Sequence, residues 1–320
     1  MNLNKKYLLF FLIFSSLSVY AAYDYINLLK TSSIVNQNTY YFLTQNKSQK
    51  SIVEELQKNN VKISYFEWRL LSFLKEKRFI PKAGEYLIPE KSTILDIQNI
   101  FHYGDTITRS FTLIEGMTAS DLKKKLLDNK YLSGEINILK EGIYKPDTYN
   151  FKYGFPRKKM LERMKLAQER LIEDIWKKKP NGFILKNKNE LLTLASIIQQ
   201  EAQNFNDSRL VASVFINRLE KRMKLQSDVT LAYGYNVNGN KITKKMLKSD
   251  HPYNTYYHYG LPPTPISYPG ENALNALKNI KKTDYLYFVS DGKGNHRFSK
   301  TYNLHKKNIM LWKKNILKDK

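Results

Sequence analysis

Residues 189–205 read NELLTLASIIQQEAQNF, and this stretch predicts a helix with one apolar face. Asn189 is a good N-terminal cap, because its side chain can accept a hydrogen bond from the first turn, and Glu190 suits the positive end of the helix dipole. Apolar residues recur every three or four positions, as one side of a helix requires. The residues on this face are Leu191, Leu194, Ala195, Ile198 and Ala202.

Glu201 falls at the edge of the apolar face, beside Leu194. A carboxyl group there would be partly desolvated, and desolvation raises the pKa of a carboxyl group. A Glu that stays protonated near neutral pH is what general acid catalysis requires. The spacing also fits a Glu at the helix rim that is hydrogen-bonded to solvent. Glu201 is therefore a candidate catalytic acid, with the solvated rim as the alternative.

A second helix is expected from Arg209 to Met223, capped by Asp207 or Ser208. Arg218 lies in the middle of its apolar face. An Arg in that position must extend its charged end to water or pair with a carboxylate. Such a pair would either tie two helices together or serve a site. The apolar face itself carries Leu210, Val211, Val214 and Phe215.

Two polar stretches follow, LQSDVT at 225–230 and YNTYYHYGLPP at 253–263. Flat aromatic rings pack on the faces of sugars, and Asn amides both donate and accept hydrogen bonds. The second stretch, with its rigid Gly-Pro turn, therefore suits a carbohydrate groove. A packed loop with ordinary aromatic anchors explains it equally well. The polar and aromatic side chains of the two stretches include Gln226, Asp228, Tyr253, Asn254 and Tyr256.

A hairpin is predicted near the end of the chain, with the strand YLYFVS at 285–290, a turn at 291–295 and a return strand that starts at His296. His296 could bind a substrate or play a structural role. The five His residues show no HExxH or comparable spacing, so no metal site is expected. The sequence also lacks the GxxxxGK[ST], GxGxxG and GxSxG motifs, and no cofactor is expected.

The segment 39–104 has the pattern of a small α/β module that would bind a surface. Its expected order is a strand (40–44), a helix (51–59), a second helix (65–79), a turn and strand (82–89) and a helix (94–101) capped by Ser92 or Thr93. Between this module and residue 189, the pattern predicts a strand at 110–115, a helix at 118–128, a loop at 140–151 and a basic helix at 157–179.

The amino terminus bears on the compartment. Residues 3–6 read LNKK, and residues 7–22 carry no charge and are mostly apolar. This pattern predicts an uncleaved transmembrane anchor at 7–24, with 1–6 in the cytoplasm, because the basic side stays inside. A cleaved signal and a buried core helix are the alternatives. Residues 25–38 would then be a linker, and the rest would lie outside the inner membrane.

Composition limits the remaining classes. The 320 residues include 53 Lys and Arg and 29 Asp and Glu, for a formal charge of +24. This charge suits nucleic acid, anionic lipid or an acidic polymer, but it also fits a Lys-rich chain that solvates its helices. No nucleic-acid-binding motif is present, so no nucleic-acid partner is expected. The absence of Cys excludes disulfides and thiolate chemistry.

Several motifs occur in one order along the chain and together resemble the endolytic murein transglycosylases, or YceG-like proteins. The resemblance implies an α+β protein with the anchor, a LysM-like module at 39–108 and a YceG-like catalytic domain at 109–320. The motifs are KAGEYLIPE (82–90), IEGMT (114–118), EGIYKPDTYNF (141–151), LASIIQQEA (194–202), VASVFINRL (211–219), LQSD (225–228), YNTY (253–256), GLPP (260–263) and LYFVSDGKGNHRFS (286–299).

The resemblance places the catalytic role on Glu201. Many relatives have Glu-x-Glu here, whereas this chain has Gln199 in the first position, which leaves one carboxylate in the motif. Val229 stands where relatives often have Pro, and Thr264 where Gly is common. Asp228 would support Glu201. The residues expected to orient the glycan or Glu201 are Arg218, Gln226, Tyr253, Asn254, Tyr256 and His296.

The implied reaction is non-hydrolytic cleavage of the β-1,4 bond between N-acetylmuramic acid and N-acetylglucosamine, which leaves a 1,6-anhydro end. A glycosidase usually needs two carboxylates, but an intramolecular hydroxyl can replace the second through proximity. The expected partners are peptidoglycan strands, the inner membrane and peptidoglycan synthases, with termination of nascent strands as the role. A non-catalytic peptidoglycan-binding scaffold and a hydrolytic, lysozyme-like enzyme are the alternatives.

Overall fold

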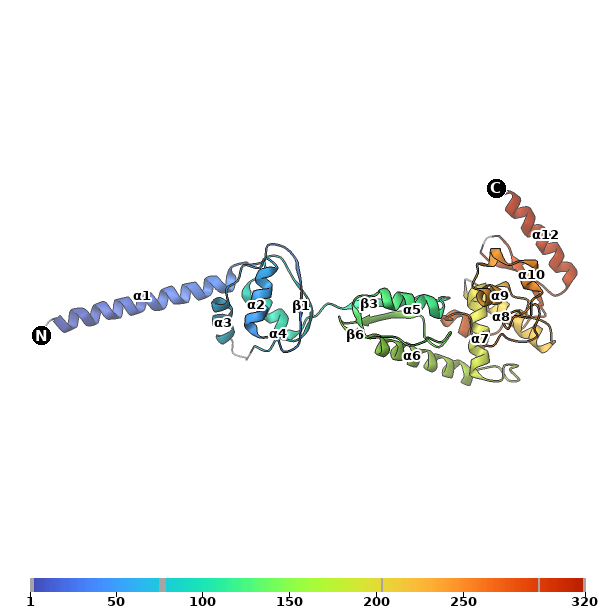
Figure 1. The fold of residues 1–320 in the computed structure, drawn as a ribbon, viewed down its shortest axis with the longest axis horizontal. Helices are drawn as coiled ribbons and strands as arrows, with labels where there is room; N and C mark the ends of the chain where they lie inside the picture. Colours follow the sequence, from blue (N-terminus) through green and yellow to red (C-terminus); the bar gives the residue numbers. More distant parts are fainter. Residues whose placement is uncertain (1–2, 75–78, 203, 293, 319–320) are drawn as a thin grey trace. The chain divides into compact units, whose positions relative to one another are not determined.

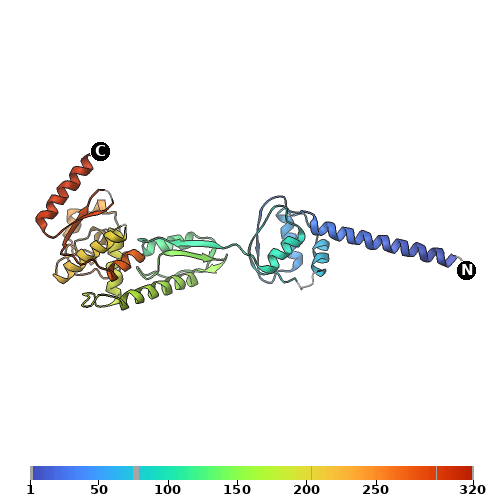
Figure 2. The ribbon, with the colours of Figure 1, turned by 180° about the vertical axis from the view of Figure 1, so that it is seen from behind.

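The computed structural model describes residues 3–74, 79–202, 204–292 and 294–318. The chain divides into two units, one that runs up to Arg109 and includes 150–153, and one that contains 110–149 and the residues from Gly154 onward. Each unit combines helices with short strands (Figures 1 and 2), which confirms the expected α+β class. Strands of the described part pair only in twos, so helices supply most of the packing.

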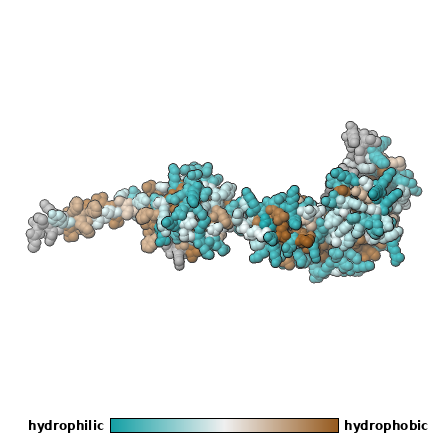
Figure 3. Space-filling view, in the orientation of Figure 1, coloured by the Kyte–Doolittle hydropathy of each residue, from teal (hydrophilic) through white to brown (hydrophobic). Residues whose placement is uncertain are grey.

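Helix α1 (Leu3–Thr31) begins the first unit. Its segment Tyr7–Thr31 is apolar and, with 25 residues, long enough to cross a membrane. The large apolar side chains between Tyr7 and Tyr23 are exposed (Figure 3), so the alternative of a buried core helix is wrong. The helix also continues beyond the expected span 7–24 into the expected linker 25–38, and Leu29 in its last turns is buried in the core of the first unit.

The first unit has a core of aromatic and aliphatic side chains around Trp68, Tyr86 and Phe101. The predicted order of strand, two helices, strand and helix is confirmed, and the two strands are antiparallel with Tyr41 opposite Tyr86. The likeness to a LysM module remains a prediction. The elements are β1 (Thr39–Leu43), α2 (Gln49–Lys58), α3 (Tyr65–Phe73), β2 (Gly84–Ile88) and α4 (Ile94–Tyr103).

Hydroxyl side chains start the three short helices of this unit. Ser48, Ser64 and Thr93 each accept a hydrogen bond of 3.2 Å from the backbone N–H three residues later, which satisfies a donor that the helix itself leaves unpaired. The helix expected over 65–79 ends at Phe73, and residues 75–78 of that prediction lie outside the described part of the chain.

Strand β3 (Arg109–Leu113), of which residues 110–113 belong to the second unit, pairs with β5 (Asp147–Phe151). The expected loop over 140–151 is therefore wrong in its second half, because the turn at Pro146 leads directly into alternating residues that bury Tyr149 and Phe151. The expected helices at 118–128 and 157–179 are confirmed. The other elements here are α5 (Ala119–Asp128), β4 (Leu132–Ser133), β6 (Phe155–Pro156) and α6 (Arg157–Lys177).

Helix α7 (Lys188–Glu201) lies in the core of the second unit. Every residue from Leu191 to Ile198 is buried, so the prediction of a single apolar face is wrong. The hydroxyls of Thr193 and Ser196 donate hydrogen bonds to backbone carbonyls of the helix, so these two polar side chains are satisfied inside the core. Helices that contact α7 include α6, α8 (Phe205–Glu220), α9 (Asp228–Tyr235) and α11 (Glu271–Lys278).

Both helices around the candidate site start earlier than predicted. The cap of α7 is Asn187 rather than Asn189, and its side chain accepts from the N–H of Glu190 at 2.9 Å. The cap of α8 is Asn204, which accepts from the N–H of Asp207 at 2.9 Å. In each case the competing caps were only a few residues apart, and the path of the preceding loop decides which one is used.

The remaining elements of the second unit lie between residues 239 and 318. The predicted hairpin is confirmed as β7 (Tyr287–Ser290) and β8 (His296–Ser299), with Lys293 of its turn outside the described residues. Helix α12 (Tyr302–Lys318), which the sequence analysis left unassigned, packs along both strands. The short segments are η1 (Gly239–Lys241) and α10 (Lys244–Leu247).

Candidate active site

Glu201 is the last residue of α7 and lines a groove of about 400 Å³. Its carboxylate accepts a hydrogen bond of 2.5 Å from the hydroxyl of Ser227. Burial raises the pKa of Glu201, and the charge of Asp228 adds to this rise, whereas the Ser227 hydrogen bond and the charges of His296 and Arg218 oppose it. The carboxyl end of a helix is the negative end of its dipole, which also disfavours a carboxylate there.

Five of the eight predicted site residues line this groove: Glu201, Arg218, Gln226, Asp228 and Tyr256. They come from α7, α8, the turn before α9, the first residue of α9 and the loop after α10. The fold brings these five residues to one groove, and their roles there remain predictions. His296 lies near Glu201 without lining this groove. Tyr253 lines a second groove, and Asn254 is buried in its own loop.

The guanidinium of Arg218 is buried and bonds to backbone carbonyls, so the expectation that it pairs with a carboxylate is wrong. It donates to Leu286 at 2.7 Å and to Leu225 at 2.8 Å, and it lies over the ring of Tyr287 at 5.3 Å. Because Leu286 precedes β7 and Leu225 precedes the Gln226 turn, Arg218 joins two walls of the groove. Its charge still favours the ionised form of Glu201.

A tight turn brings Ser227 to Glu201. Gln226 has φ of 48°, in the left-handed region, and its N–H donates to the carbonyl of Thr255 at 3.1 Å. The N–H of Ser227 donates to the Thr255 hydroxyl at 3.0 Å. These two bonds fix the turn to the 253–256 loop, so Ser227 projects toward α7 and Asp228 starts α9.

The Asp228 carboxylate is exposed and accepts a hydrogen bond of 2.8 Å from the hydroxyl of Tyr256. Burial and the neighbouring Asp228 charge raise the pKa of Tyr256 above its ordinary value, so this hydroxyl stays protonated and acts as a donor. Asp228 also lines a second groove, described below, and therefore lies at the border of the two.

His296, the first residue of β8, has its Nδ1 2.6 Å from the buried carboxylate of Asp207. Burial lowers the pKa of His296, but the hydrogen bond to Asp207 and its charge outweigh burial, and the net pKa is raised. The imidazolium that this pair favours lies close enough to Glu201 to favour the carboxylate. His296 thus acts on the groove through charge rather than from its lining.

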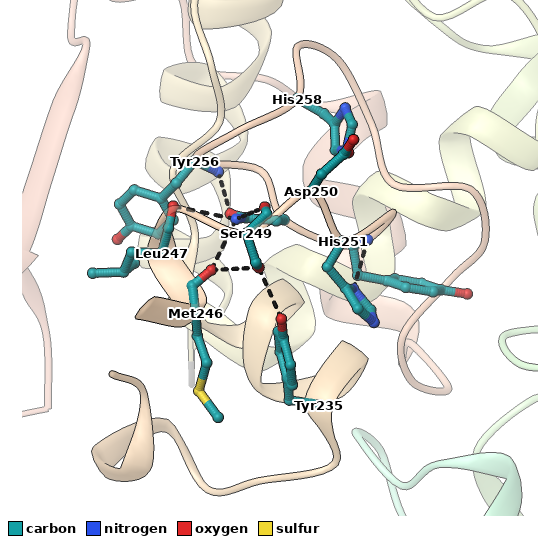
Figure 4. Close-up of polar contacts among 10 residues, drawn as sticks. Tyr235, Met246, Leu247, Ser249, Asp250, His251, Tyr256 and His258 are labelled. Carbon is teal, nitrogen blue, oxygen red and sulfur yellow. Dashed lines mark hydrogen bonds and ion pairs between the residues drawn. The ribbon is translucent and has the colours of Figure 1, made fainter. Parts of the chain in front are cut away.

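Asn254 is fully buried and holds its own loop together. Its amide N–H₂ donates to the carbonyls of Met246, Leu247 and Ser249 at 3.1, 3.2 and 2.7 Å, and its oxygen accepts from the N–H of Tyr256 at 3.0 Å. The same cluster includes a hydrogen bond of 2.8 Å between Tyr235 and Ser249 (Figure 4). The amide is used by these contacts, so in this structure Asn254 holds the shape of the loop that carries Tyr256.

Tyr253 lines a second groove of about 790 Å³ together with Tyr233 and Glu141. The two tyrosine rings are 5.1 Å apart, and the Tyr253 hydroxyl is 2.6 Å from that of Thr264. Glu141 accepts from the N–H of Ala119 and from the Tyr233 hydroxyl, and burial raises its pKa.

The side chains at which this sequence departs from the family pattern make defined contacts in the structure. Gln199 turns away from Glu201 and accepts a hydrogen bond of 3.0 Å from the N–H of Gly270, at the start of α11. Thr264 bonds the hydroxyl of Tyr253, and Val229 packs against the core of the second unit. Each substituted side chain thus takes part in the local packing.

Sequence reasoning missed Ser227, Glu141 and the groove-facing residues of α12. Ser227 lies inside the quoted LQSD motif and Glu141 begins the EGIYKPDTYNF motif, so position within a motif was the available signal. For α12, the only signal was the spacing of residues 302, 305, 309 and 312. Within the described residues, no three His, Asp or Glu side chains gather as a metal site would require, and the expectation of no metal remains a prediction.

The chain belongs to the YceG-like family, whose profile matches residues 42–310. Its relatives include two proteins named endolytic murein transglycosylase. The protein from Bacillus subtilis (strain 168) is 35% identical over 204 residues, which are 59% of this chain and 53% of that protein. The protein from Streptococcus pneumoniae serotype 2 (strain D39) is 33% identical over 160 residues, which are 47% of this chain and 28% of that protein.

The matched regions thus span about half or less of those relatives' own length. The fold is also similar to a solved structure, a YceG-like protein of Listeria monocytogenes at 2.6 Å. That similarity has a TM-score of 0.53 and 27% sequence identity, and it covers 85% of this chain and 99% of the other. The family and the general arrangement are therefore shared along most of the chain.

Proposed function

We propose that this chain is an endolytic lytic transglycosylase that cleaves the β-1,4 bond between N-acetylmuramic acid and N-acetylglucosamine in peptidoglycan. The observation that carries the proposal is Glu201 at the end of a buried helix, with its carboxyl pKa raised, in a groove lined by tyrosines and Arg218. The names of the two relatives, endolytic murein transglycosylase, support the same reaction class.

In this reaction, protonated Glu201 donates its proton to the glycosidic oxygen while the bond from that oxygen to C1 breaks. The resulting carboxylate then takes the proton of the C6 hydroxyl on the same muramic acid, and the oxygen of that hydroxyl bonds to C1. Glu201 ends protonated, no water is consumed, and the product carries a 1,6-anhydro end. The raised pKa suits the first step, and the hydroxyl of Ser227 stabilises the carboxylate in the second.

One carboxylate suffices in this scheme because the attacking hydroxyl belongs to the substrate and is held next to C1. A hydrolytic mechanism would need a second carboxylate to activate water or to form a covalent intermediate. Asp228 is the nearest candidate, but it is exposed and occupied by the Tyr256 hydroxyl. We therefore assign Asp228 and Tyr256 a supporting role. Arg218, Gln226 and His296 would position the groove walls and tune the charge of Glu201.

The apolar helix at the amino terminus supports a location at a membrane. We infer that the apolar part of α1 is a single-pass anchor in the inner membrane, with the amino terminus in the cytoplasm and both units in the periplasm or outside. The first unit would serve as a LysM-like module that contacts glycan. An enzyme held there acts on strands as they are made, which fits termination of nascent strands beside peptidoglycan synthases.

The test compares the full-length wild type with Glu201→Gln on nascent, un-cross-linked glycan and on mature sacculi, with mass spectrometry of the released fragments. We expect 1,6-anhydro ends from the wild type and none from the variant. Reducing ends would contradict the lytic reaction and direct attention to Asp228. If neither protein releases glycan fragments but both still bind the glycan, the result would favour the non-catalytic scaffold.

A further inference from the structure

Helix α12 presents one face to the groove that holds Glu201. Tyr302, His305, Ile309 and Trp312 all line this groove, and their spacing of three, four and three residues places them on one side of a helix. Two residues of the same helix outside this face, Leu304 and Leu311, are exposed and do not line it. The groove-facing side of α12 is therefore mainly aromatic and distinct from the rest of the helix.

His305 presents a polar aromatic ring to this groove. Its ring stacks on Tyr287 with centroids 5.2 Å apart and planes at 23°, and its Nδ1 is buried without a hydrogen-bond partner among the described residues. Because Nδ1 itself has almost no accessible surface, a ligand in the groove would contact the accessible part of the imidazole rather than this atom. Burial and the charge of Arg218 lower the pKa of His305, which keeps the ring neutral near pH 7.

We propose that α12 forms one wall of the glycan-binding groove, in which the accessible part of the His305 imidazole hydrogen-bonds a hydroxyl or N-acetyl group of the strand and Trp312 contacts a sugar ring. This inference rests on the proposed function and adds substrate-binding residues to the same site. The occupant follows from the lining, because sugars combine apolar ring faces with hydroxyl and amide groups, and this wall combines rings with one neutral polar atom.

The proposal predicts an effect on binding rather than on the chemical step, because neither side chain takes part in the proton transfers at Glu201. Removal of one neutral hydrogen bond should raise KM for un-cross-linked glycan oligomers by about threefold to tenfold. Since the same contact exists before and during the reaction, kcat should change little. Loss of the Trp312 ring should raise KM at least as much.

The experiment uses the full-length chain with His305→Phe, which keeps a ring on Tyr287 but removes the nitrogens, and with Trp312→Ala. Leu304→Ala and Leu311→Ala are the matched controls, since they change the same helix away from the groove. His305→Gln tests rescue, because its amide can restore a hydrogen bond. KM and kcat are measured by mass spectrometry of the released fragments, and circular dichroism checks that each variant is folded.

A second readout needs no change in α12. In the Glu201→Gln background, nitrogen NMR of the imidazoles should show the His305 resonance shift when glycan oligomers are added, with His305→Phe used to assign it. The proposal is overturned if this resonance does not move at saturation, or if both groove-facing variants keep the KM of their controls. In that case, wild-type release of 1,6-anhydro fragments would leave the proposed function standing. If oligomers bind in a way that depends on His305 but no fragments are released, the proposed reaction is wrong and the binding wall stands.

Discussion

The hydroxyl of Ser227 donates a hydrogen bond of 2.5 Å to the carboxylate of Glu201, across 26 residues of sequence. The contact joins the end of α7 to the turn before α9, and it opposes the rise in the Glu201 pKa that burial causes. It therefore sets how much of Glu201 is protonated at a given pH. The first prediction follows from this relationship.

Ser227→Ala should raise the pKa of Glu201 further, because a hydrogen bond to the charged form of an acid lowers its pKa. If Glu201 must be protonated to start the reaction, activity falls on the alkaline side as it ionises. That alkaline limb of the kcat/KM profile should move to higher pH in the variant, by up to about one unit. Ser227→Thr keeps the donor and is the control. A limb that stays in place in Ser227→Ala would show that this hydroxyl does not tune Glu201.

Glu201→Gln should make the protein more stable near neutral pH. In the folded protein the pKa of Glu201 lies above its ordinary value of 4.5, so the unfolded chain loses this proton at a lower pH than the folded protein does. The wild type therefore loses stability as the pH rises from 4.5 to the pKa of the folded state. Gln does not ionise and avoids this loss. The check is thermal unfolding of both proteins at several pH values in the same detergent. If the difference in Tm between Glu201→Gln and the wild type were the same at pH 4 and pH 8, the raised pKa of Glu201 would be contradicted.

Asp207→Asn should destabilise the protein more at pH 6 than at pH 9. The raised pKa of His296 means that the stability from its pairing with Asp207 is fully present below the ordinary value of 6.5 and is lost as pH rises through the folded pKa. Since Asp207 is buried, its loss should cost about 3 kcal/mol at the lower pH. Thermal unfolding at the two pH values measures this. The variant should also have a higher Glu201 pKa, because the nearby positive charge is weakened.

Asn254→Ala should destabilise the loop that carries Tyr256, because three backbone carbonyls lose their donor. We expect a loss of about 2 to 3 kcal/mol in the free energy of unfolding, and lower activity through a displaced Ser227 turn. Limited proteolysis and thermal unfolding are the measurements. The exposed Asn238 is the matched control, and Asn238→Ala should leave stability unchanged. A direct glycan contact by Asn254 would instead raise KM without faster proteolysis.

Local sequence predicted the elements whose cause is local. Helical patterns located α2 and α5, a Ser or Thr cap helped to locate α4, and the strand and turn pattern of 285–295 located β7, because these patterns depend on neighbours within a few residues. The caps of α7 and α8 were displaced by two or more residues for the same reason, since several Asn, Asp and Ser side chains compete there. The one-sided helix expected at 189–205 failed, because burial on the other sides depends on helices that come from elsewhere in the chain.

Sequence by itself determined that Glu201 lies on a helix with an apolar face in a YceG-like chain, since both the helical spacing and the motif order are present in the residues. Only the tertiary structure decided what surrounds it. In it, the Arg218 guanidinium donates hydrogen bonds to backbone carbonyls and the Asn254 amide donates to carbonyls of its own loop. The Ser227 hydroxyl donates to the carboxylate of Glu201. The tertiary structure also lays α12 along the groove with the His305 Nδ1 unpaired. The physical reason is that pKa values and binding surfaces depend on distances between segments far apart in sequence, which only the packing of the whole unit sets.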